Sequence, residues 1–419
     1  MPQSAERRLR ILSPLAERDF RLLWAGQTVS LLGDGITTIA LAWQTYELSR
    51  NPVALSMVLL ARSVPMLVLL LIGGAVSDRL PRRAVMLASD LVRGAAVGVI
   101  AFLSAGGVLE VWHLVVLAAV FGAADAFFQP AYSAVFPDIL PKALLVQANS
   151  LTSATRPVTL FLAGPALGGL LVGALGSASA FGADAATFAV SAACLLGMRS
   201  RPGRGTGGEK ILAEIGEGLR YTRGTPWIWA TLIAAAVSIL FVEGPYHVLL
   251  PIVVAERLGG GAAVFGFVSA VEGLGALLGA IAIGQWGVPR RKITVMYIAW
   301  SVSCVIIGLI GVAPTVAAAA AFSGLSGAGF QLGAVIWATM LQQLVPARML
   351  GRVTSLDWLV SFALAPVSFG LAGPVARQIG GSVTLLAGGV LGGIALLLGL
   401  LVPGVRDPER RDPGVGTDG

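Results

Sequence analysis

The sequence predicts an all-α integral membrane protein with twelve transmembrane helices in two pseudo-symmetric six-helix bundles. Its 419 residues are 56% hydrophobic and only 12% charged, whereas soluble domains carry about 25% charged residues. The apolar residues fall into runs long enough to cross a bilayer, and short clusters of arginine separate these runs. Similar motifs also recur about 205 residues apart. Together these observations favour lipid as the solvent and two repeated halves as the architecture.

Twelve runs are long enough to be spans, because a transmembrane helix needs about 20 mostly apolar residues. The first six runs cover 22–48, 53–77, 84–106, 112–135, 149–174 and 178–199. The second six cover 227–251, 261–286, 293–312, 316–341, 353–376 and 381–403. The first run is too long for the core of a signal peptide, so we interpret it as a retained helix.

Composition divides the chain into five predicted parts. They are a cytoplasmic N-terminal segment (1–21), a six-helix bundle (22–199), a cytoplasmic linker (200–226), a second bundle (227–403) and a disordered cytoplasmic tail (404–419). In the linker, Ile211, Ile215 and Leu219 alternate with charged residues. This pattern predicts a short amphipathic helix on the inner membrane surface.

Two pairs of motifs carry the internal repeat. Pro141 is followed nine residues later by Ser150, and Pro346 by Ser355, at an offset of 205. Pro81-Arg82-Arg83 recurs as Pro289-Arg290-Arg291, at an offset of 208. Repeats in the same order and at nearly constant spacing are typical of transporters built from parallel halves.

The basic residues predict the orientation. If the N-terminus is cytoplasmic, 23 of the 29 lysines and arginines lie in inside segments, and only Arg50, Arg257 and Arg377 lie outside. Because cytoplasmic loops are enriched in Lys and Arg, we predict a multi-pass plasma-membrane protein with both termini in the cytoplasm.

Several classes of protein lack support in the sequence. The two cysteines, Cys194 and Cys304, and the two histidines, His113 and His247, are isolated, so no metal site, cofactor or enzyme is predicted. Basic residues are not interleaved with aromatic ones, which argues against nucleic acid. We expect the partners to be a small-molecule substrate, protons and membrane lipids, and the protein to be a monomer.

Charges within the predicted spans are functional or paired by default, since each costs about 2.5–3.5 kcal/mol to insert at the bilayer centre. The proton-coupling candidates are Asp34, Glu272, Asp125 and Glu243, and the charge-pair candidates are Arg62, Asp90 and Arg93. A carboxylate whose access to water alternates can bind and release a proton, and Asp34 and Glu272 fit that role best. The alternative is that they are satisfied internal polar groups.

Depth and spacing predict specific contacts among these charges. Asp34 and Arg62 lie about 18 and about 24 Å from the cytoplasmic ends of their helices, close enough to pair. Asp90 and Arg93 share a helix face, and Asp125 lies at a similar depth. For these three, a structural salt-bridge cluster is favoured over direct coupling. Asp184 lies too near the outer surface to be preferred.

The segment after the second predicted helix contains a charged motif made of Gly74, Asp78, Arg79, Arg82 and Arg83. It resembles the signature loop between helices 2 and 3 of the major facilitator superfamily. The resemblance implies that Asp78 and Arg82 form a charge relay with Asp138 and hold the N-terminus of helix 11, as a cytoplasmic gate. The alternative is a loop charged only for topology, which fits the second copy, where Trp286 and Gly287 replace the acid and the first arginine.

The fifth predicted helix contains Gly164-Pro165-Ala166-Leu167-Gly168-Gly169. This resembles the Gly-Pro-x-x-Gly-Gly element of exporters and antiporters in the same superfamily, although Leu160 stands where their preceding glycine is expected. Glycines permit tight helix packing, and proline removes a backbone hydrogen bond. The alternative is a kinked packing helix with no bearing on direction.

Further segments resemble one branch of the superfamily, the one that includes the enterobactin exporter and the macrolide-efflux proteins. They are Arg18–Trp24, Leu32-Gly33-Asp34, Asp90–Arg93, Asp125–Ala131 and Gly351-Arg352-Val353. The resemblance implies proton-coupled efflux of small amphipathic molecules, such as drugs, macrolides or siderophores, by alternating access. The alternatives are a lipid or lysophospholipid flippase or an importer of the same fold, and a non-transporting membrane scaffold or sensor.

Helices 1, 4, 7 and 10 line the cavity in this superfamily. By that resemblance the cavity candidates are Gln27, Thr37, Gln129, Tyr132, Tyr246, Gln331 and Trp337. This mixed polar and aromatic set suits bulky amphipathic molecules but selects none of them.

Overall fold

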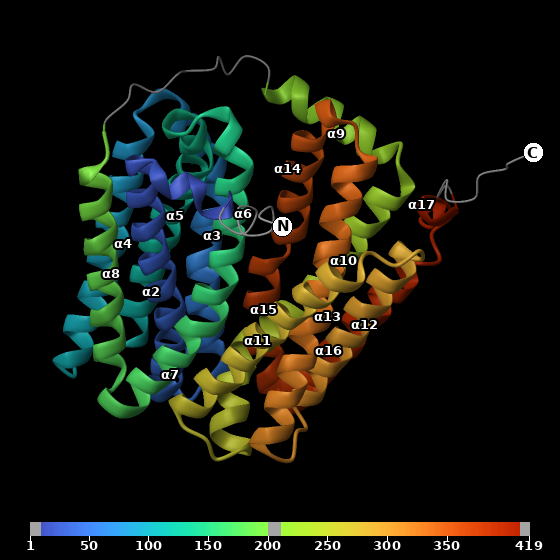
Figure 1. The fold of residues 1–419 in the computed structure, drawn as a ribbon. Helices are drawn as coiled ribbons and strands as arrows, with labels where there is room; N and C mark the ends of the chain where they lie inside the picture. The colour runs from blue at the N-terminus through green and yellow to red at the C-terminus, as the bar shows by residue number, and fades with distance from the viewer. Residues whose placement is uncertain (1–9, 200–210, 411–419) are drawn as a thin grey trace, which may run out of the picture. The chain divides into compact units, whose positions relative to one another are not determined.

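The computed structural model describes residues 10–199 and 211–410, and these contain helices, turns and no strand (Figure 1). Within these described ranges, eleven helical segments are long and apolar enough to cross a membrane. The helix α2 (Arg18–Ser49) has 32 residues, which is also long enough, but it carries more polar side chains. The all-helical membrane fold predicted from the sequence is confirmed.

The remaining helices follow the predicted runs closely. In the first half they are α3 (Pro52–Arg79), α4 (Arg82–Ala105), α5 (Val111–Ile139), α6 (Leu145–Arg156), the π-helical η3 (Pro157–Ala163), α7 (Gly164–Leu175) and α8 (Ser177–Gly197). In the second half they are α9 (Ile211–Arg223), α10 (Pro226–Ile252), η5 (Val253–Arg257), α11 (Ala262–Trp286), α12 (Lys292–Ile310), α13 (Val316–Leu344), α14 (Ala347–Ala363), α15 (Ala365–Ile379) and α16 (Gly381–Gly399). Short helices η1 (Arg10–Ala16), η2 (Lys142–Leu144) and α17 (Asp407–Arg410) complete the described chain.

The chain forms two compact units, and each takes in the start of one helix from the opposite half. Among described residues, unit 1 comprises 10–50, 57–199 and 260–270, and unit 2 comprises 51–56, 211–259 and 271–410. Within unit 1, Trp43 of α2 stacks on Phe265 of α11 with ring centroids 6.3 Å apart. Within unit 2, the backbone N–H of Gly373 donates to Ser56 Oγ at 2.7 Å. These contacts join the start of α11 to α2 within unit 1 and the start of α3 to α15 within unit 2.

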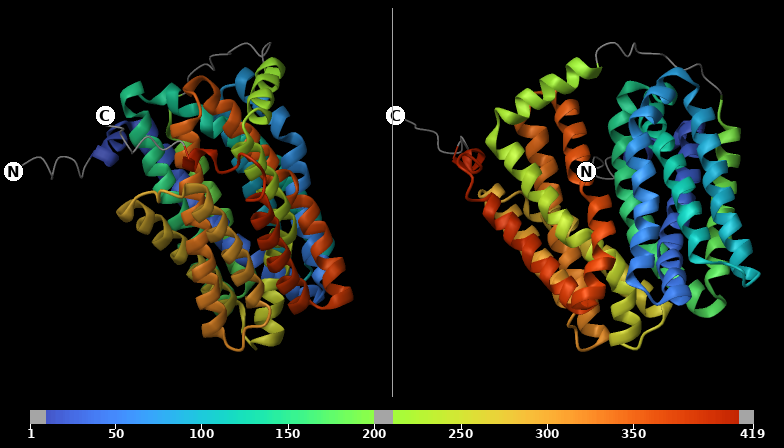
Figure 2. Two further views of the ribbon diagram at one scale, coloured as in Figure 1. Left: turned by 90° about the vertical axis from the view of Figure 1, so that its right-hand side faces the viewer. Right: turned by 180° about the vertical axis from the view of Figure 1, so that it is seen from behind.

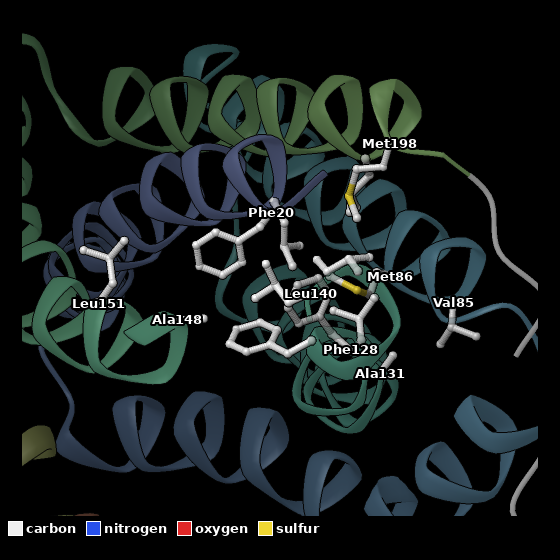
Figure 3. Packing of buried hydrophobic residues seen from close by; sticks show 14 residues of the cluster. Phe20, Val85, Met86, Phe128, Ala131, Leu140, Ala148, Leu151 and Met198 are labelled. Atoms are coloured by element: carbon white, nitrogen blue, oxygen red, sulfur yellow. The ribbon is translucent and has the colours of Figure 1, made fainter. Parts of the chain in front are cut away.

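In unit 1, α8 packs against α2 and α4, and α4 packs against α5 (Figure 1). A cluster of buried side chains, including Phe20, Met86, Phe128 and Leu140, fills the space between α2, α4 and α5 (Figure 3). Phe20 and Phe136 meet edge to face in this cluster, with centroids 5.7 Å apart. Such close packing gives the unit a dense apolar end.

In unit 2, α10 and α12 pack against α16, and α12 also packs against α13 (Figure 2). Glycines bring α11 and α13 into close contact, because a methyl group at Gly275 or Gly279 would collide with the backbone of Gly324 or Ala328. The predicted linker helix is present as α9, and it packs against α14.

Two predicted spans are interrupted near a proline. The fifth span passes through η3 before Pro165 at the start of α7, and the eleventh breaks at Leu364 before Pro366 in α15. Each proline lacks an N–H and its ring crowds the carbonyl four residues earlier, which favours a local irregularity of the helix at that point.

Candidate proton-coupling and substrate sites

A buried ion cluster crosses α4 and α5 in unit 1. Arg93 binds Asp90 through Nη2 to Oδ1 at 2.5 Å and Asp125 through Nη1 to Oδ1 at 3.2 Å. Ser191 Oγ of α8 donates to the other oxygen of Asp90 at 2.6 Å. The guanidinium of Arg93 also lies 4.2 Å from the ring centroid of Phe128. Each of the three charged groups thus has an ionic partner, as expected for a structural salt-bridge cluster.

The expected contact between Asp34 and Arg62 is absent from this structure, since no ion pair within 4.0 Å joins these two described residues. Arg62 instead lies over the ring of Phe121, 4.5 Å from its centroid. Asp34 Oδ1 is buried without a hydrogen-bond partner. Similar depth placed the two residues at one level of the unit, but depth does not fix the direction of a side chain.

A small cavity of about 10 Å³ lies beside Arg62, lined also by Thr37, Leu41, Ala118 and Phe121. This volume is just enough for one water molecule. It is too small for an organic substrate.

Asp184 is a buried acid that the sequence argument set aside. It is 0% exposed and accepts hydrogen bonds from Thr37 Oγ1 at 2.6 Å and from Thr187 Oγ1 at 3.0 Å. Gly33 provides the space, because a methyl group there would collide with the Asp184 carboxylate. Position near a helix end did not imply exposure, because α2 covers this face of α8.

The acids of unit 2 have different partners. The Tyr246 hydroxyl of α10 donates to Glu272 Oε2 of α11 and lies 3.4 Å from Ser323 Oγ of α13. On the same helix, His247 Nε2 lies 3.2 Å from Glu243 Oε1. These two side chains are 42% and 37% exposed. The sequence argument treated His247 as isolated, although its spacing of four from Glu243 was visible.

A further acid in unit 2, Asp357 of α14, was also missed. It accepts hydrogen bonds from Trp337 Nε1 at 3.1 Å and from Ser361 Oγ at 3.4 Å. The ring of Trp337 packs edge to face on Trp227 of α10, with centroids 5.6 Å apart. The sequence did contain a signal for this site, because Asp357 is an acid ten residues inside a predominantly apolar helix.

The motif after α3 makes part of the network implied by the family resemblance. Arg82 Nη1 binds Asp138 Oδ2 at 2.6 Å and donates to the carbonyl of Ala134 at 2.7 Å. Arg83 donates to the carbonyl of Leu196 at 2.8 Å, while Arg79 is exposed. The side chain of Asp78 lies outside the described residues.

The glycines of this motif differ from each other. A methyl group at Gly73 would collide with the backbone of Ala126 in α5, whereas one at Gly74 would meet open space. The close approach of α3 to α5 therefore depends on Gly73 and not on Gly74.

The glycines in α7 are all used for close packing within unit 1. Gly164 abuts Gly35 of α2, Gly168 abuts Ile36, and Gly169 abuts Gly266 at the start of α11. The Gly-Pro element therefore joins three helices, which agrees with its predicted packing role.

The seven predicted cavity residues do not share one environment. Four are buried and hydrogen-bonded: Gln27 to Ser191, Thr37 to Asp184, Tyr246 to Glu272 and Trp337 to Asp357. Gln129, Tyr132 and Gln331 are half-buried, and Gln129 lies 3.4 Å from Asp125. No group of three His, Cys, Asp or Glu in the described ranges could hold a metal ion.

This fold, with membrane-embedded charges in both halves, defines a secondary transporter of the major facilitator type. The family model described as "Transmembrane secretion effector" (MFS_3) matches residues 10–411. The chain therefore belongs to this transporter family and is not an enzyme.

Relatives in this family are named as efflux proteins. The chain is 29% identical to the multidrug efflux pump Tap of Mycolicibacterium fortuitum, covering 87% of this chain and 91% of Tap. It is 23% identical to macrolide efflux protein A of Streptococcus pyogenes, covering 94% and 97%. It is 28% identical to the enterobactin exporter EntS of Shigella boydii, covering 80% of each. The predicted branch is confirmed.

A solved structure of a POT family transporter in complex with a thioalcohol-conjugated peptide shares the fold. It superposes with a TM-score of 0.71 at 13% identity, covering 92% of this chain and 96% of that one. At this identity the likeness concerns the fold alone.

Proposed function

We propose that this transporter exports small amphipathic organic molecules across the plasma membrane in exchange for protons, with both termini in the cytoplasm. The direction is supported by the family and by the efflux activity in the names of Tap and macrolide efflux protein A. The observation that carries proton coupling is the environment of Glu272. Its partner is the Tyr246 hydroxyl, and no Lys or Arg of the described chain pairs with it within 4.0 Å.

This environment allows Glu272 to change its charge without breaking an ion pair. The ionised carboxylate accepts the hydrogen bond from Tyr246, and the protonated acid can remain in place as a neutral group. A carboxylate fixed beside an arginine has no such freedom, because its proton would have to displace the cation. Glu272 is therefore the first candidate for the proton carrier, with Glu243 and its partner His247 as the second site.

In this proposal the transport cycle works by alternating access. The two six-helix halves rock about a central site so that the site opens to one side at a time. One proton moving through 100 mV gains about 2.3 kcal/mol, and one pH unit adds about 1.4 kcal/mol. At tenfold per about 1.4 kcal/mol, this supports a substrate gradient on the order of several hundredfold. The charged motif around Arg82 and Asp138 acts as the cytoplasmic gate in this proposal.

The test uses purified protein in liposomes loaded with a pH-sensitive dye. Addition of a transported compound, such as ethidium, should move protons in the opposite direction to the compound, and an imposed pH gradient should accelerate its movement. Collapse of the gradient with a protonophore should remove that acceleration. Transport at the same rate with and without the gradient would reject proton coupling. Lipid movement in the absence of any gradient would favour the flippase alternative.

A further inference from the structure

The carboxylate of Asp357 lies inside a membrane-spanning helix and has no cationic partner. Asp357 is ten residues after the start of α14, which is about 15 Å along the helix, and it is half-buried. Among the described residues, no Lys, Arg or His lies within ion-pair distance of it. The acids of unit 1 around Arg93 show the opposite arrangement, since they are paired at 2.5 and 3.2 Å.

The neighbours of Asp357 are aromatic. Trp337 of α13 donates its indole N–H to Oδ2 at 3.1 Å, and its ring packs on Trp227 of α10. The next residue along α14 is Trp358, whose side chain is 62% exposed. The indole N–H and the Ser361 hydroxyl fix the carboxylate in one orientation without neutralising its charge.

A carboxylate that an indole N–H and a hydroxyl hold in place, and that no cation neutralises, can bind an organic cation. The carboxylate supplies the opposite charge, and the face of a nearby aromatic ring attracts a cation. An aliphatic or aryl cation also gains from apolar contact that an inorganic ion cannot make. A purely structural link between α13 and α14 would need a hydrogen-bond acceptor, which a neutral amide also provides.

We propose that Asp357, oriented by Trp337, forms a subsite for the positively charged group of organic-cation substrates. This inference rests on the proposed export function and specifies its substrate class as amphipathic cations. The charge of Asp357 is what selects the cation. Trp337 is a positioning residue, because it acts through the carboxylate that it orients.

Binding measurements in lipid nanodiscs test the subsite without any gradient. The probes are tetraphenylphosphonium, a permanent cation, and triphenylphosphine oxide, an uncharged molecule with the same kind of aryl groups, each measured by equilibrium dialysis. For Asp357→Asn we expect affinity for the cation to fall at least tenfold and affinity for the uncharged probe to stay within threefold. Asp357→Glu should restore cation binding to within threefold of the unaltered protein.

A second variant covers the case in which Asp357→Asn does not fold. Ser361→Lys places an ammonium one helical turn from Asp357, where it should compete with the bound cation and reduce tetraphenylphosphonium binding at least tenfold. Equal losses for both probes, unchanged cation binding in both variants, or no binding of the cation by the unaltered protein would overturn the proposal. Loss of export with cation binding intact would instead count against the proposed function alone.

Discussion

The two units place different chemistry at equivalent positions of their repeated halves. Asp34-Gly35 of α2 and Glu243-Gly244 of α10 are separated by 209 residues, close to the offsets of the sequence repeats. Gly35 abuts Gly164 in the fifth span, and Gly244 abuts Ser368 in the eleventh. The surroundings of the two acids therefore correspond, although their partners do not. His247 pairs with Glu243, whereas Thr38 at the corresponding position donates to the backbone carbonyl of Asp34.

The second equivalent position differs in the sign of its charge. Arg62 of α3 and Glu272 of α11 are 210 residues apart, and each lies where a glycine of the neighbouring span comes closest. A methyl group at Gly122 would collide with the backbone of Arg62, and one at Gly327 with that of Glu272. An arginine stacked on Phe121 thus corresponds to a glutamate bonded to Tyr246.

This difference assigns different tasks to the units. In unit 1, Arg93 pairs with two buried aspartates, so its charges are fixed together. In unit 2, Glu272 and Asp357 are held by hydroxyl and indole donors and Glu243 by a histidine, all within the described chain. Fixed ion pairs rigidify, whereas acids with neutral or titratable partners can exchange protons or bind cations. Unit 1 thus contains an ion cluster fixed by Arg93 beside one acid, Asp184, that is held by threonine hydroxyls, whereas the three acids named in unit 2 have only neutral or titratable partners.

The largest effect is expected when the ion cluster of unit 1 loses its cation. Arg93→Met leaves Asp90 and Asp125 buried without their cationic partner, and we expect the free energy of unfolding to fall by about 3–5 kcal/mol. Arg62→Met is the control, because Arg62 makes a cation–π contact worth only about 0.5–2 kcal/mol. Denaturant titration in detergent measures both. Similar losses in the two variants would contradict a rigid cluster centred on Arg93.

The next effect concerns transport rather than stability. Glu272→Gln keeps the shape of the side chain but removes its exchangeable proton. The proton-driven concentration ratio should therefore fall on the order of 100-fold, or about 2.8 kcal/mol at about 1.4 kcal/mol per tenfold. Glu256→Gln, at an exposed acid in η5, is the matched control and should leave the ratio unchanged. Both ratios are measured in proteoliposomes with an imposed pH gradient. If the Glu272→Gln protein still reaches the full substrate concentration ratio, Glu272 is not the proton carrier.

A smaller effect tests whether both units use glycine in the same way. Gly73→Ala forces a methyl group against the backbone of Ala126, and Gly279→Ala does the same against Ala328. Each should cost about 1–3 kcal/mol of stability. Gly74→Ala, which meets open space, should be neutral or stabilising by up to about 1 kcal/mol. Thermal unfolding in detergent compares the three variants, and a costly Gly74→Ala would show that the space beside α3 is occupied in solution.

The sequence was sufficient for the fold because span length and apolar content are properties of local stretches. Each predicted run coincides with a helix except for a few residues at its ends, and the fifth and eleventh coincide with helices interrupted near proline. Contacts within one helix were also accessible, as Asp90 and Arg93 show. The direction of a side chain toward a neighbouring helix could not be predicted from the sequence. Their similar depth in the membrane predicted a pair between Asp34 and Arg62, whereas Arg62 lies over the ring of Phe121.

The missed acids have a common physical reason. Asp184 and Asp357 are each satisfied by hydroxyl or indole donors from a neighbouring span, and such donors are common in membrane helices. Only the fold reveals which threonine or tryptophan meets which acid. A search restricted to opposite charges therefore finds the cluster around Arg93 and passes over the hydrogen-bonded acids.

The smallest effect is expected for an arginine pair that unit 2 does contain. Arg352 of α14 binds Glu217 of α9, and the two side chains are 27% and 53% exposed. Water and salt screen such a pair, so Glu217→Gln should cost only about 0.2–1 kcal/mol. Arg82→Gln, which breaks the less exposed pair with Asp138 in unit 1, should cost more. Denaturant titration at low and high salt measures both, and the Glu217 effect should shrink with salt. A larger loss for Glu217→Gln than for Arg82→Gln would mean that an ion pair to α9 contributes strongly to the stability of unit 2. The contrast between the ion pairs of unit 1 and the hydrogen-bonded acids of unit 2 would then fail.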